Sequence, residues 1–312
     1  MRENTIICGD CLEVMKGFPD NLADLVFCSP PYGPARTYGI DFKLKGQAWV
    51  DWALERYVEC LRVSKGLVAW VVEGSTKNFR YSATPILLMA DLHRAGVHLR
   101  KPPAFHRVGI PGSGGPDWLR NDYEFIICAT SGGKLPWSDN TAMGEPCKYA
   151  TGGKLSYRNK EGVRANHRRG YHSGGSTQKK HEQQARPKIA NPGNVIQQLY
   201  TANEVAALLE QQGNVIKCNV GGGTMGSKLA HENEAPFPEK LAEFFVRSFC
   251  PPGGIVLDPF SGSGTTLATA EKTGRKWIGI DIRESQVELS NKRIKEARAG
   301  QGALFDDTRE RQ

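Results

Sequence analysis

The segment from Val256 to Thr266 constrains the fold of this chain more than any other feature. An apolar run ends in the carboxylate of Asp258, turns through Gly262 and Gly264, and enters a helical pattern. Glycines let such a turn approach a ligand closely, and the first N–H groups of the following helix can bind a negative group. No Lys-Ser/Thr pair follows the glycines, so the turn is not a P-loop, and the three-glycine dinucleotide spacing is missing as well. The segment therefore predicts a nucleotide-type ligand site at the end of a strand.

Short apolar runs alternate with helical patterns on both sides of the middle of the chain. The expected strands are 5–8, 24–28, 66–72, 123–129, 254–258 and 276–281, and the expected helices are 47–63, a helix starting at Pro238, 265–272 and 284–297. Such alternation favours βαβ crossovers and a mostly parallel sheet that is covered on both faces. We therefore expect an α/β fold, in which Asp281 at the end of a strand is placed to accept from ribose hydroxyls.

A second motif, Asp24–Tyr32, is an apolar strand that runs into Ser29-Pro30-Pro31-Tyr32. Two prolines fix the backbone, remove two N–H donors and leave carbonyls that can face a cleft. Ser29 Oγ and the Pro30 carbonyl are suited to accept the two N–H bonds of an amine, and the Tyr32 ring offers a stacking face. An ordinary strand-ending turn is the alternative interpretation.

The middle third of the chain, residues 131–230, breaks the alternating pattern. It holds 14 of the 41 Lys and Arg residues but only 6 of the 33 Asp and Glu residues, so the net charge of +8 arises there. A concentrated basic segment is typical of a surface that binds a polyanion, because neutralised phosphates release counterions. A solvated basic loop region would explain the same charge.

Taken together, the two motifs resemble those of the amino-methylating DNA methyltransferases. These enzymes pair an Asp/Asn/Ser-Pro-Pro-Tyr/Phe/Trp motif with a Phe-x-Gly-x-Gly cofactor motif, which match Ser29–Tyr32 and Phe260–Gly264 here. The catalytic motif comes first and the cofactor motif last, which is similar to the order in the β class. Gly9-Asp10 and Ala235–Leu241 are further matches.

The resemblance implies a Rossmann-like class I methyltransferase fold that is circularly permuted. The expected parts are a catalytic half over 1–130, an inserted basic target-recognition region over 131–230, a cofactor-binding half over 231–299 and a flexible tail over 300–312. The helix 284–297 would end the fold, and the segment Thr5–Asp10 would supply the strand beside the one that ends at Asp281. The termini would then lie close together.

S-adenosylmethionine is the cofactor that the resemblance implies. Asp10 would accept from the adenine amine, and Asp281 would hold the ribose. The other implied cofactor-binding residues are Pro236, Phe237, Asp258, Phe260, Ser261, Gly262, Gly264 and Thr265. For Phe237 and Phe260, packing in the core is the alternative role.

The implied reaction is direct methyl transfer to an exocyclic base amine of duplex DNA after base flipping, with Tyr32 stacking on the extruded base. In the family, serine at the first motif position goes mostly with N4 of cytosine, and aspartate or asparagine goes mostly with N6 of adenine. Ser29 therefore favours cytosine-N4, with adenine-N6 as the alternative. Methylation of RNA or of a protein glutamine, and a non-catalytic DNA-binding module, are the other hypotheses.

Double-stranded DNA is the expected partner, and a homodimer and a cognate restriction endonuclease are the protein partners to consider. The expected DNA-binding residues are Arg36, Arg164, Arg168, Arg169, Lys179 and Lys180. No apolar run has the length of a membrane span and no secretory signal is recognisable, so we expect a cytoplasmic protein. The eight cysteines are interpreted as free thiols, and no metal site is expected.

Overall fold

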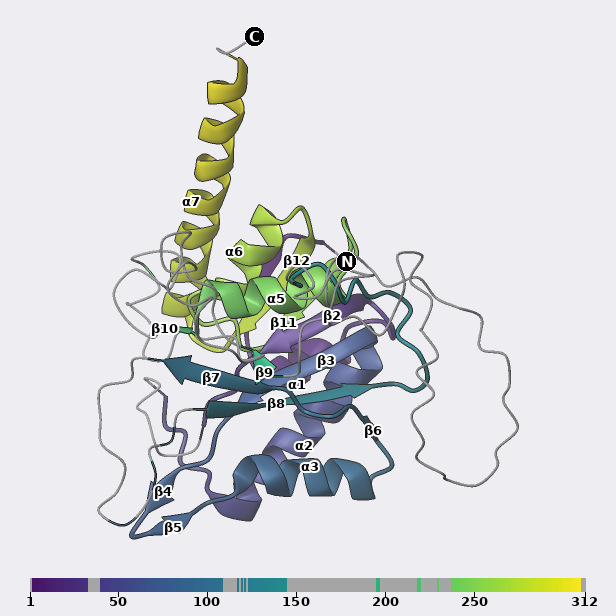
Figure 1. The fold of residues 1–312 in the computed structure, drawn as a ribbon, viewed down its shortest axis with the longest axis vertical. Coiled ribbons are helices and arrows are strands. Elements are labelled where there is room, and N and C mark those ends of the chain that lie inside the picture. Colours follow the sequence, from purple (N-terminus) through teal and green to yellow (C-terminus); the bar gives the residue numbers. More distant parts are fainter. Residues whose placement is uncertain are drawn as a thin grey trace, which may run out of the picture.

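The computed structural model of the chain describes residues 2–32, 40–108, 117, 119, 121, 123–144, 195–196, 218–219, 229 and 237–309. Within these ranges a central sheet lies between two layers of helices (Figure 1). The strands are β1 (Thr5–Cys8), β2 (Ala23–Cys28), β3 (Ser64–Val72), β4 (Thr76–Lys77), β5 (Arg80–Tyr81), β6 (His98–Leu99), β7 (Ala104–Val108), β8 (Tyr123–Thr130), β9 (Val195–Ile196), β10 (Cys218–Asn219), β11 (Ile255–Asp258) and β12 (Lys276–Asp281). The helices are α1 (Cys11–Lys16), α2 (Gly46–Val63), α3 (Thr84–Arg94), α5 (Glu239–Phe249), α6 (Thr265–Lys272) and α7 (Glu284–Arg309).

The strand order of the main sheet is β1-β12-β11-β2-β3-β8-β7-β10, with β6 paired to β8 and β9 paired to β7. The first five strands of this order are mutually parallel, whereas β8 runs antiparallel to both β3 and β7. The expected permutation is confirmed, because β1 pairs with β12 in parallel from Thr5–Ile278 to Cys8–Asp281. Segments from the two ends of the sequence thus lie side by side in the sheet.

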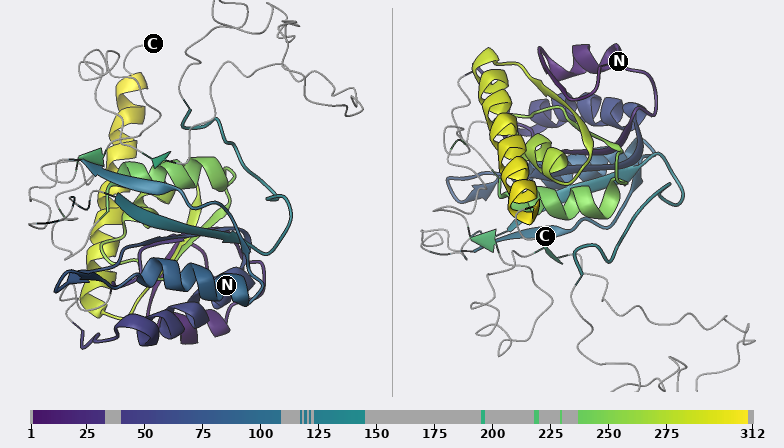
Figure 2. Two further views of the ribbon diagram at one scale, coloured as in Figure 1. Left: turned by 60° about the horizontal axis from the view of Figure 1, so that its bottom comes forward. Right: turned by 90° about the horizontal axis from the view of Figure 1, so that it is seen from above.

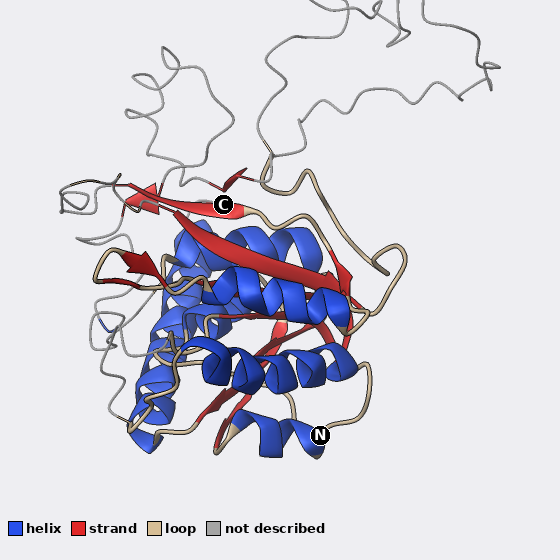
Figure 3. Cartoon of the chain, turned by 90° about the horizontal axis from the view of Figure 1, so that it is seen from below, coloured by secondary structure: helices blue, strands red, loops and turns tan. Residues whose placement is uncertain are grey.

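Each face of the sheet buries its own cluster of apolar side chains, as the two-residue period of β2 shows. Val26 and Cys28 belong to the cluster beneath α1, α2 and α3, whereas Leu25 and Phe27 belong to the cluster beneath α5, α6 and α7. Figure 3 shows the first helical layer from below, and Figure 2 shows α5 and α7 of the second layer. A strand buried on both faces reads as a continuous apolar run, which is the pattern that predicted β2.

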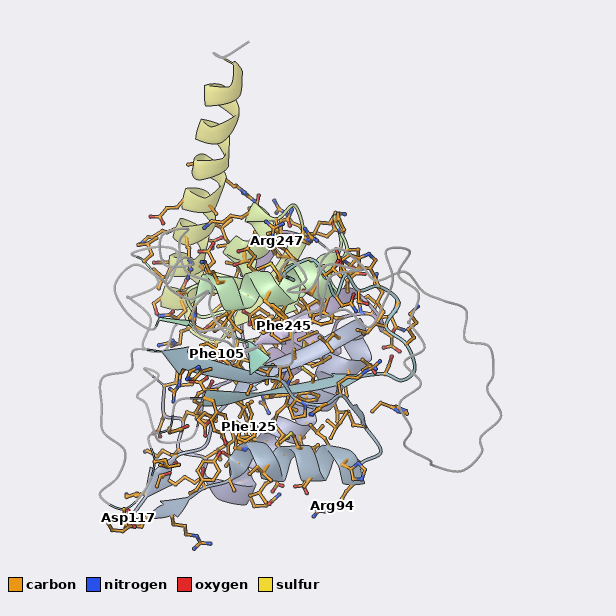
Figure 4. The ribbon with its side chains drawn as sticks, in the orientation of Figure 1. Arg94, Phe105, Asp117, Phe125, Phe245 and Arg247 are labelled. Atoms are coloured by element: carbon orange, nitrogen blue, oxygen red, sulfur yellow. The ribbon has the colours of Figure 1, made fainter. Side chains whose placement is uncertain are left out.

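Aromatic packing fixes α5 onto the sheet. Phe245, 1% exposed, stacks on Phe27 with ring centroids 4.6 Å apart. In Figure 4 Phe245 points from α5 toward the sheet, and Arg247, two residues later, points away from it. This helix begins after Pro238, which is its N-cap residue and not the first helical residue that the sequence suggested.

The predicted strands and helices are present, with boundaries that differ by one or two residues for most of them. The last helix is the exception: α7 does not end at Ala297 but continues to Arg309. The expectation that this helix ends at Ala297 and leaves the termini close together was therefore wrong, whereas the flexibility of residues 300–312 stays a prediction. Helical backbone continues through most of the expected tail and carries the end of the described chain away from β1 (Figure 1).

The described parts of the middle third are attached to the main sheet. β9 and β10 each pair with β7, and the backbone N–H of Asp139 donates to the Ser248 carbonyl at the end of α5. Leu135 and Met143 pack against the apolar cluster beneath α5. The start of this third is therefore a covering segment of the second helical layer.

Along the described residues, no helix combines the length and the apolar character needed to cross a membrane. Six cysteines of the described residues are free thiols: Cys8, Cys11, Cys28, Cys60, Cys128 and Cys250. Burial raises the pKa of the Cys11, Cys128 and Cys250 thiols to about 12, so these groups act as small apolar side chains.

Candidate active site

A pocket opens at the carboxyl edge of the parallel strands, where the direction of the crossovers reverses. β11 leads through α6 to β12 on one side, and β2 leads through α2 to β3 on the other, so the loops after β11 and β2 diverge. Ligands of doubly wound sheets bind in the crevice at such a point. The pocket is lined by Gly9–Cys11 after β1, Ser29 and Pro31 after β2, Pro259–Ser263 and Thr265 after β11, Asp281–Arg283 after β12, and by Ile40, Phe42, Trp52, Arg56 and Phe237.

The turn after β11 requires glycine at two positions. Gly262 and Gly264 have φ angles of 48° and 74°, in the left-handed region that favours glycine. At Gly264 an added Cβ would lie only 2.8 Å from Ser290 Oγ of α7, and that hydroxyl donates to the Gly262 carbonyl at 2.7 Å. The two glycines thus let α7 approach the turn closely while the backbone at Gly262 lines the pocket.

A buried guanidinium supports the same turn from below. Arg293 of α7, 1% exposed, donates to Thr265 Oγ1 at 2.7 Å and to Ser263 Oγ at 3.3 Å. Its second terminal nitrogen lies 3.5 Å from a carboxylate oxygen of Glu239 at the start of α5. All three helices of the second layer therefore meet beneath the glycine turn.

Two carboxylates at neighbouring strand ends have different environments. Asp281 lines the pocket and accepts from the backbone N–H groups of Gly262 and Arg283, each at 2.9 Å. Asp258 does not line the pocket; it is 1% exposed and accepts from the Phe260 N–H at 3.0 Å. Burial raises the pKa of Asp258 to about 7, although hydrogen bonds from Thr266 and Phe260 oppose the shift. Asp258 thus shapes the turn from beneath.

One end of the pocket combines a carboxylate with aromatic rings. Asp10 caps α1 through a bond from the Leu12 N–H at 2.9 Å, and its other oxygen accepts from Arg56 at 2.9 Å. Burial alone would raise the pKa of Asp10, but Arg56 and the α1 backbone bonds outweigh it and lower the pKa. The Arg56 guanidinium lies 4.5 Å from the centre of the Trp52 ring, which neighbours Phe260 at 5.8 Å. This end can hold a flat ring that carries an amine.

The loop Ser29–Tyr32, hereafter the acceptor loop, is fastened at three points. Ser29 Oγ donates to Tyr32 Oη at 3.0 Å, and Tyr32 Oη lies 2.9 Å from Glu124 Oε2 and 3.2 Å from the Val71 carbonyl. Trp49 Nε1 donates to the Pro31 carbonyl at 2.8 Å. The loop is therefore held firmly, and Ser29 lines the same pocket as the glycine turn.

The carboxylate that receives the Tyr32 hydroxyl belongs to an ion pair inside the sheet. Glu124, at the start of β8, is 6% exposed, and its Oε1 lies 3.0 Å from Arg107 Nη1 on the neighbouring strand β7. Because Glu124 is paired and accepts, the Tyr32 proton points to it, and the Ser29 proton points in turn to Tyr32. The lone pairs of Ser29 Oγ are then available to a donor in the pocket.

The model of a DNA methylase family, the N6/N4 methylases, matches residues 23–292, a span that contains both the acceptor loop and the glycine turn. The chain belongs to the N6/N4 DNA methylase family. With some relatives the similarity is modest and extends over nearly the whole chain.

Two similar sequences show this. "DNA adenine methyltransferase YhdJ" of Escherichia coli (strain K12) is 25% identical over 93% of this chain and 82% of the relative. "Orphan methyltransferase M.BamHII" of Bacillus amyloliquefaciens is 28% identical over 95% of this chain and 92% of the relative.

Solved structures of DNA methylases share the fold. The cytosine-N4-specific PvuII DNA methyltransferase matches with a TM-score of 0.59 at 20% identity, over 94% of this chain and 86% of that chain. A putative DNA modification methylase from Thermus thermophilus, complexed with S-adenosyl-L-methionine, matches with a TM-score of 0.55 at 19% identity, over 94% and 95% of the two chains.

The structure brings most of the site residues expected for this DNA methylase into one pocket. Those that line it are Asp10, Ser29, Pro31, Phe237, Phe260, Ser261, Gly262, Thr265 and Asp281. Pro30, Tyr32, Asp258 and Gly264 lie next to these residues and do not line the pocket. Pro236 and the expected DNA-binding residues Arg36, Arg164, Arg168, Arg169, Lys179 and Lys180 lie outside the described residues.

Several residues in and around the pocket of this DNA methylase escaped the sequence analysis. Trp52 and Arg56 come from α2, where their four-residue spacing places both on the pocket side of the helix. An arginine within the apolar face of a helix is the signal that could have revealed them. Glu124 stands 92 positions after Tyr32, and no local pattern connects these two residues.

Proposed function

We propose that this DNA methylase transfers a methyl group from S-adenosylmethionine to the N4 amine of cytosine in duplex DNA, after the target nucleotide has been flipped out. The observation that carries the proposal is a shared pocket: Ser29 of the acceptor loop and Gly262 of the glycine turn line the same space. An amine acceptor and a nucleotide-type binding turn are the two parts that such a transfer needs next to each other.

The donor groups of the pocket fit the cofactor. Ser261 lines the pocket, and its buried Oγ has no hydrogen-bond partner among the described residues, so a polar ligand group would give it one. Asp281 would hold ribose hydroxyls, and Asp10 with Trp52 and Phe260 would hold the adenine ring. When bound, S-adenosylmethionine supplies a methyl group that its sulfonium already activates. The related Thermus thermophilus protein is a complex with this compound.

Ser29 and Pro30 would prepare the amine for attack. A base amine conjugated to its ring is a poor nucleophile, so its lone pair has to be turned out of conjugation. Accepting bonds at Ser29 Oγ and the Pro30 carbonyl would pull the nitrogen toward tetrahedral geometry and stabilise the positive charge that develops on it. The Glu124–Tyr32–Ser29 chain supports this role, because it directs the Ser29 proton away from the pocket. The lost proton would pass to water.

The rigid position of Tyr32 supports a stacking role. Its hydroxyl is held by Glu124, so the ring has one orientation and a flipped base would find a preformed surface. Phosphate contacts of the duplex would come from Arg36, Arg164, Arg168, Arg169, Lys179 and Lys180, as their clustered charge suggests.

The choice of cytosine rests on Ser29 and on the similarity to the PvuII DNA methyltransferase, which is cytosine-N4-specific. Adenine-N6 is the second candidate, which the resemblance to the DNA adenine methyltransferase YhdJ favours. The two bases place their amines on rings of different size, so the product nucleoside distinguishes them directly.

The deciding experiment is transfer of label from methyl-labelled S-adenosylmethionine to duplex DNA, followed by digestion to nucleosides and chromatography. We expect the label in the N4-methylcytosine nucleoside. Label in the N6-methyladenine nucleoside would replace the cytosine assignment, and absence of label from DNA with label in RNA or protein would overturn the proposal. Sequencing-based mapping of modified bases in cells that express the chain then reports the recognition sequence.

A further inference from the structure

The hairpin β4–β5 carries a strained and exposed aromatic residue at its tip. Thr76 pairs with Tyr81 and Lys77 with Arg80, which leaves Asn78 and Phe79 as a two-residue turn. Their φ angles are 50° and 61°, as in the type I′ turn, where the second position normally holds glycine. Phe79 instead places a large side chain there, and 78% of it is exposed. Neither backbone preference nor apolar burial explains this residue, which points to a contact made outside the chain.

The base of the hairpin is anchored firmly to the end of β3. Tyr81 Oη donates to Glu73 Oε1 at 2.9 Å, and the Tyr81 ring packs on Gly74, where an added Cβ would lie 2.5 Å from it. Ser75 and Ser82 close the base with bonds of 3.0 and 2.8 Å. The tip is therefore presented by a rigid support.

This support adjoins the acceptor loop. Glu73 follows β3 directly, and Tyr32 Oη lies 3.2 Å from the carbonyl of Val71 near the end of the same strand. From Gly74 to Phe79 an extended chain covers about 16 Å, which exceeds the depth of either DNA groove, about 8 Å. In Figure 1 the hairpin projects beyond the sheet at the lower left. A duplex whose target base entered the pocket beside Ser29 would thus lie within reach of the tip.

The chemistry of the tip matches a nucleic acid. Lys77 and Arg80 flank the turn and are both exposed, and Phe79 stands between them. Cationic side chains neutralise phosphates, and an apolar ring can occupy the space between base pairs. Tyr81 and Tyr123, 36% and 45% exposed, add aromatic surface near the base of the hairpin.

We infer that the β4–β5 hairpin is a DNA wedge: Lys77 and Arg80 bind phosphates beside the target nucleotide, and Phe79 enters the base stack where that nucleotide leaves it. The inference deepens the proposed function and rests on it, since it assigns the flipping step to a defined part of the chain. Filling the vacated place would compensate for the lost stacking and keep the target base in the pocket.

Phe79→Gly is the sharpest test, because an Asn-Gly pair is the preferred type I′ turn. The variant should be as stable as the parent or more stable, with an unchanged or higher Tm. We nevertheless expect kcat/KM on a duplex with the mapped recognition sequence to fall at least tenfold. With the target base opposite an abasic site, where no base pair has to be broken, the loss should shrink to less than threefold. Val58→Ala, at an apolar residue on α2 that is 44% exposed, is the matched control and should change neither value.

Lys77→Ala and Arg80→Ala test the phosphate contacts through binding to a fluorescein-labelled duplex of arbitrary sequence. Each should weaken binding and lower the slope of log K against log salt by about one.

An unchanged slope in both variants, or equal losses of Phe79→Gly on paired and abasic duplexes, would overturn the wedge. If Phe79→Gly instead abolished self-association in sedimentation velocity and left both duplexes unaffected, the tip would be a contact between copies. Failure of the parent enzyme to methylate DNA would refute the proposed function, and the binding arm would still decide whether the hairpin contacts DNA.

Discussion

Tyr32 Oη and Glu124 Oε2 lie 2.9 Å apart and connect the acceptor loop to the far side of the sheet. Glu124 stands on β8, two strands away from β2, and its second oxygen is paired with Arg107. The hydroxyl of Ser29 is thereby oriented by a chain of three groups and not by its own loop alone. The orientation of the Ser29 hydroxyl thus depends on Glu124, which does not line the pocket.

Replacing Tyr32 by phenylalanine should expose this dependence. Tyr32→Phe keeps the ring for stacking but removes the acceptor of the Ser29 proton, so the Ser29 hydroxyl loses its fixed direction. We expect kcat to fall about tenfold with little change in KM, and Ser29→Ala to lower kcat by about 100-fold or more, as for the loss of an active-site hydrogen bond to a developing charge. Steady-state methyl transfer to duplex DNA measures both.

Tyr57→Phe is the matched control for that experiment. Tyr57 is fully buried and its hydroxyl contacts the carbonyls of Val68 and Ile127 at 3.2 and 3.0 Å. Its loss should lower the free energy of unfolding by about 1 kcal/mol and leave kcat unchanged. A similar fall of kcat in Tyr32→Phe and Tyr57→Phe would mean that both act through stability alone.

Asp10→Asn should weaken the binding of S-adenosylmethionine. Asparagine caps a helix about as well as aspartate, so α1 is retained, but the charge that faces Arg56 and the ring site is lost. We expect Kd to rise about tenfold in calorimetric titrations. Asp20→Asn removes an exposed carboxylate that pairs with Arg62 and should leave Kd unchanged; equal effects at both positions would contradict the role of Asp10.

Gly264→Ala and Gly274→Ala separate strain from crowding. Both glycines have similar φ angles, 74° and 70°, but a Cβ at Gly274 meets nothing within 4 Å, whereas one at Gly264 meets Ser290. We expect Gly274→Ala to cost about 1–2 kcal/mol in urea unfolding and to leave the cofactor Kd unchanged. Gly264→Ala should cost more and also weaken cofactor binding, because the turn at Gly262 must shift; equal costs would exclude crowding by α7.

The elevated pKa of Asp258 predicts a pH-dependent loss of stability. In the folded state its pKa is about 7, against an ordinary value of 3.8, so the folded protein binds this proton more tightly than the unfolded chain. The resulting stabilisation is complete below about pH 4 and disappears as the pH rises toward 7, and it amounts to at most about 4 kcal/mol. Asp258→Asn does not titrate, so the stability difference between variant and parent in urea unfolding should grow in favour of the variant from pH 4 to pH 7. A constant difference across this range would refute the assigned pKa.

The regular core of the fold was predictable because its signals are local. Thr265–Lys272 and Lys276–Asp281 have the predicted bounds, since an apolar run and a glycine turn define each boundary. The hairpin β4–β5 was missed because Asn78-Phe79 lacks the glycine of a typical hairpin turn. A sequence pattern predicts that a charged residue such as Arg293 is exposed. Only the packing of α5, α6 and α7 against one another shows that Arg293 is buried.

The residues of the candidate site divide in the same way. Ser29 follows β2, Gly262 lies in the turn after β11 and Asp281 ends β12, so strand ends predicted their common location. Arg56, Trp52 and Glu124 reach their positions through contacts between distant segments, which no local pattern encodes. Sequence reasoning therefore located the site residues at strand ends and missed those that come from distant segments.

The parallel pairing of β1 with β12 has a consequence for how the chain matures on the ribosome. The strand that follows Met1 within a few residues acquires its neighbour only after residue 281 has been synthesised. Until then β1 has no place in the sheet, and Asp10 and Asp281 cannot form one site. A nascent or prematurely terminated chain is thus expected to be unable to bind the cofactor, and folding has to wait for a contact of very high sequence separation, which makes it slow. During that delay the backbone edge of β1 is expected to stay unpaired and prone to aggregation.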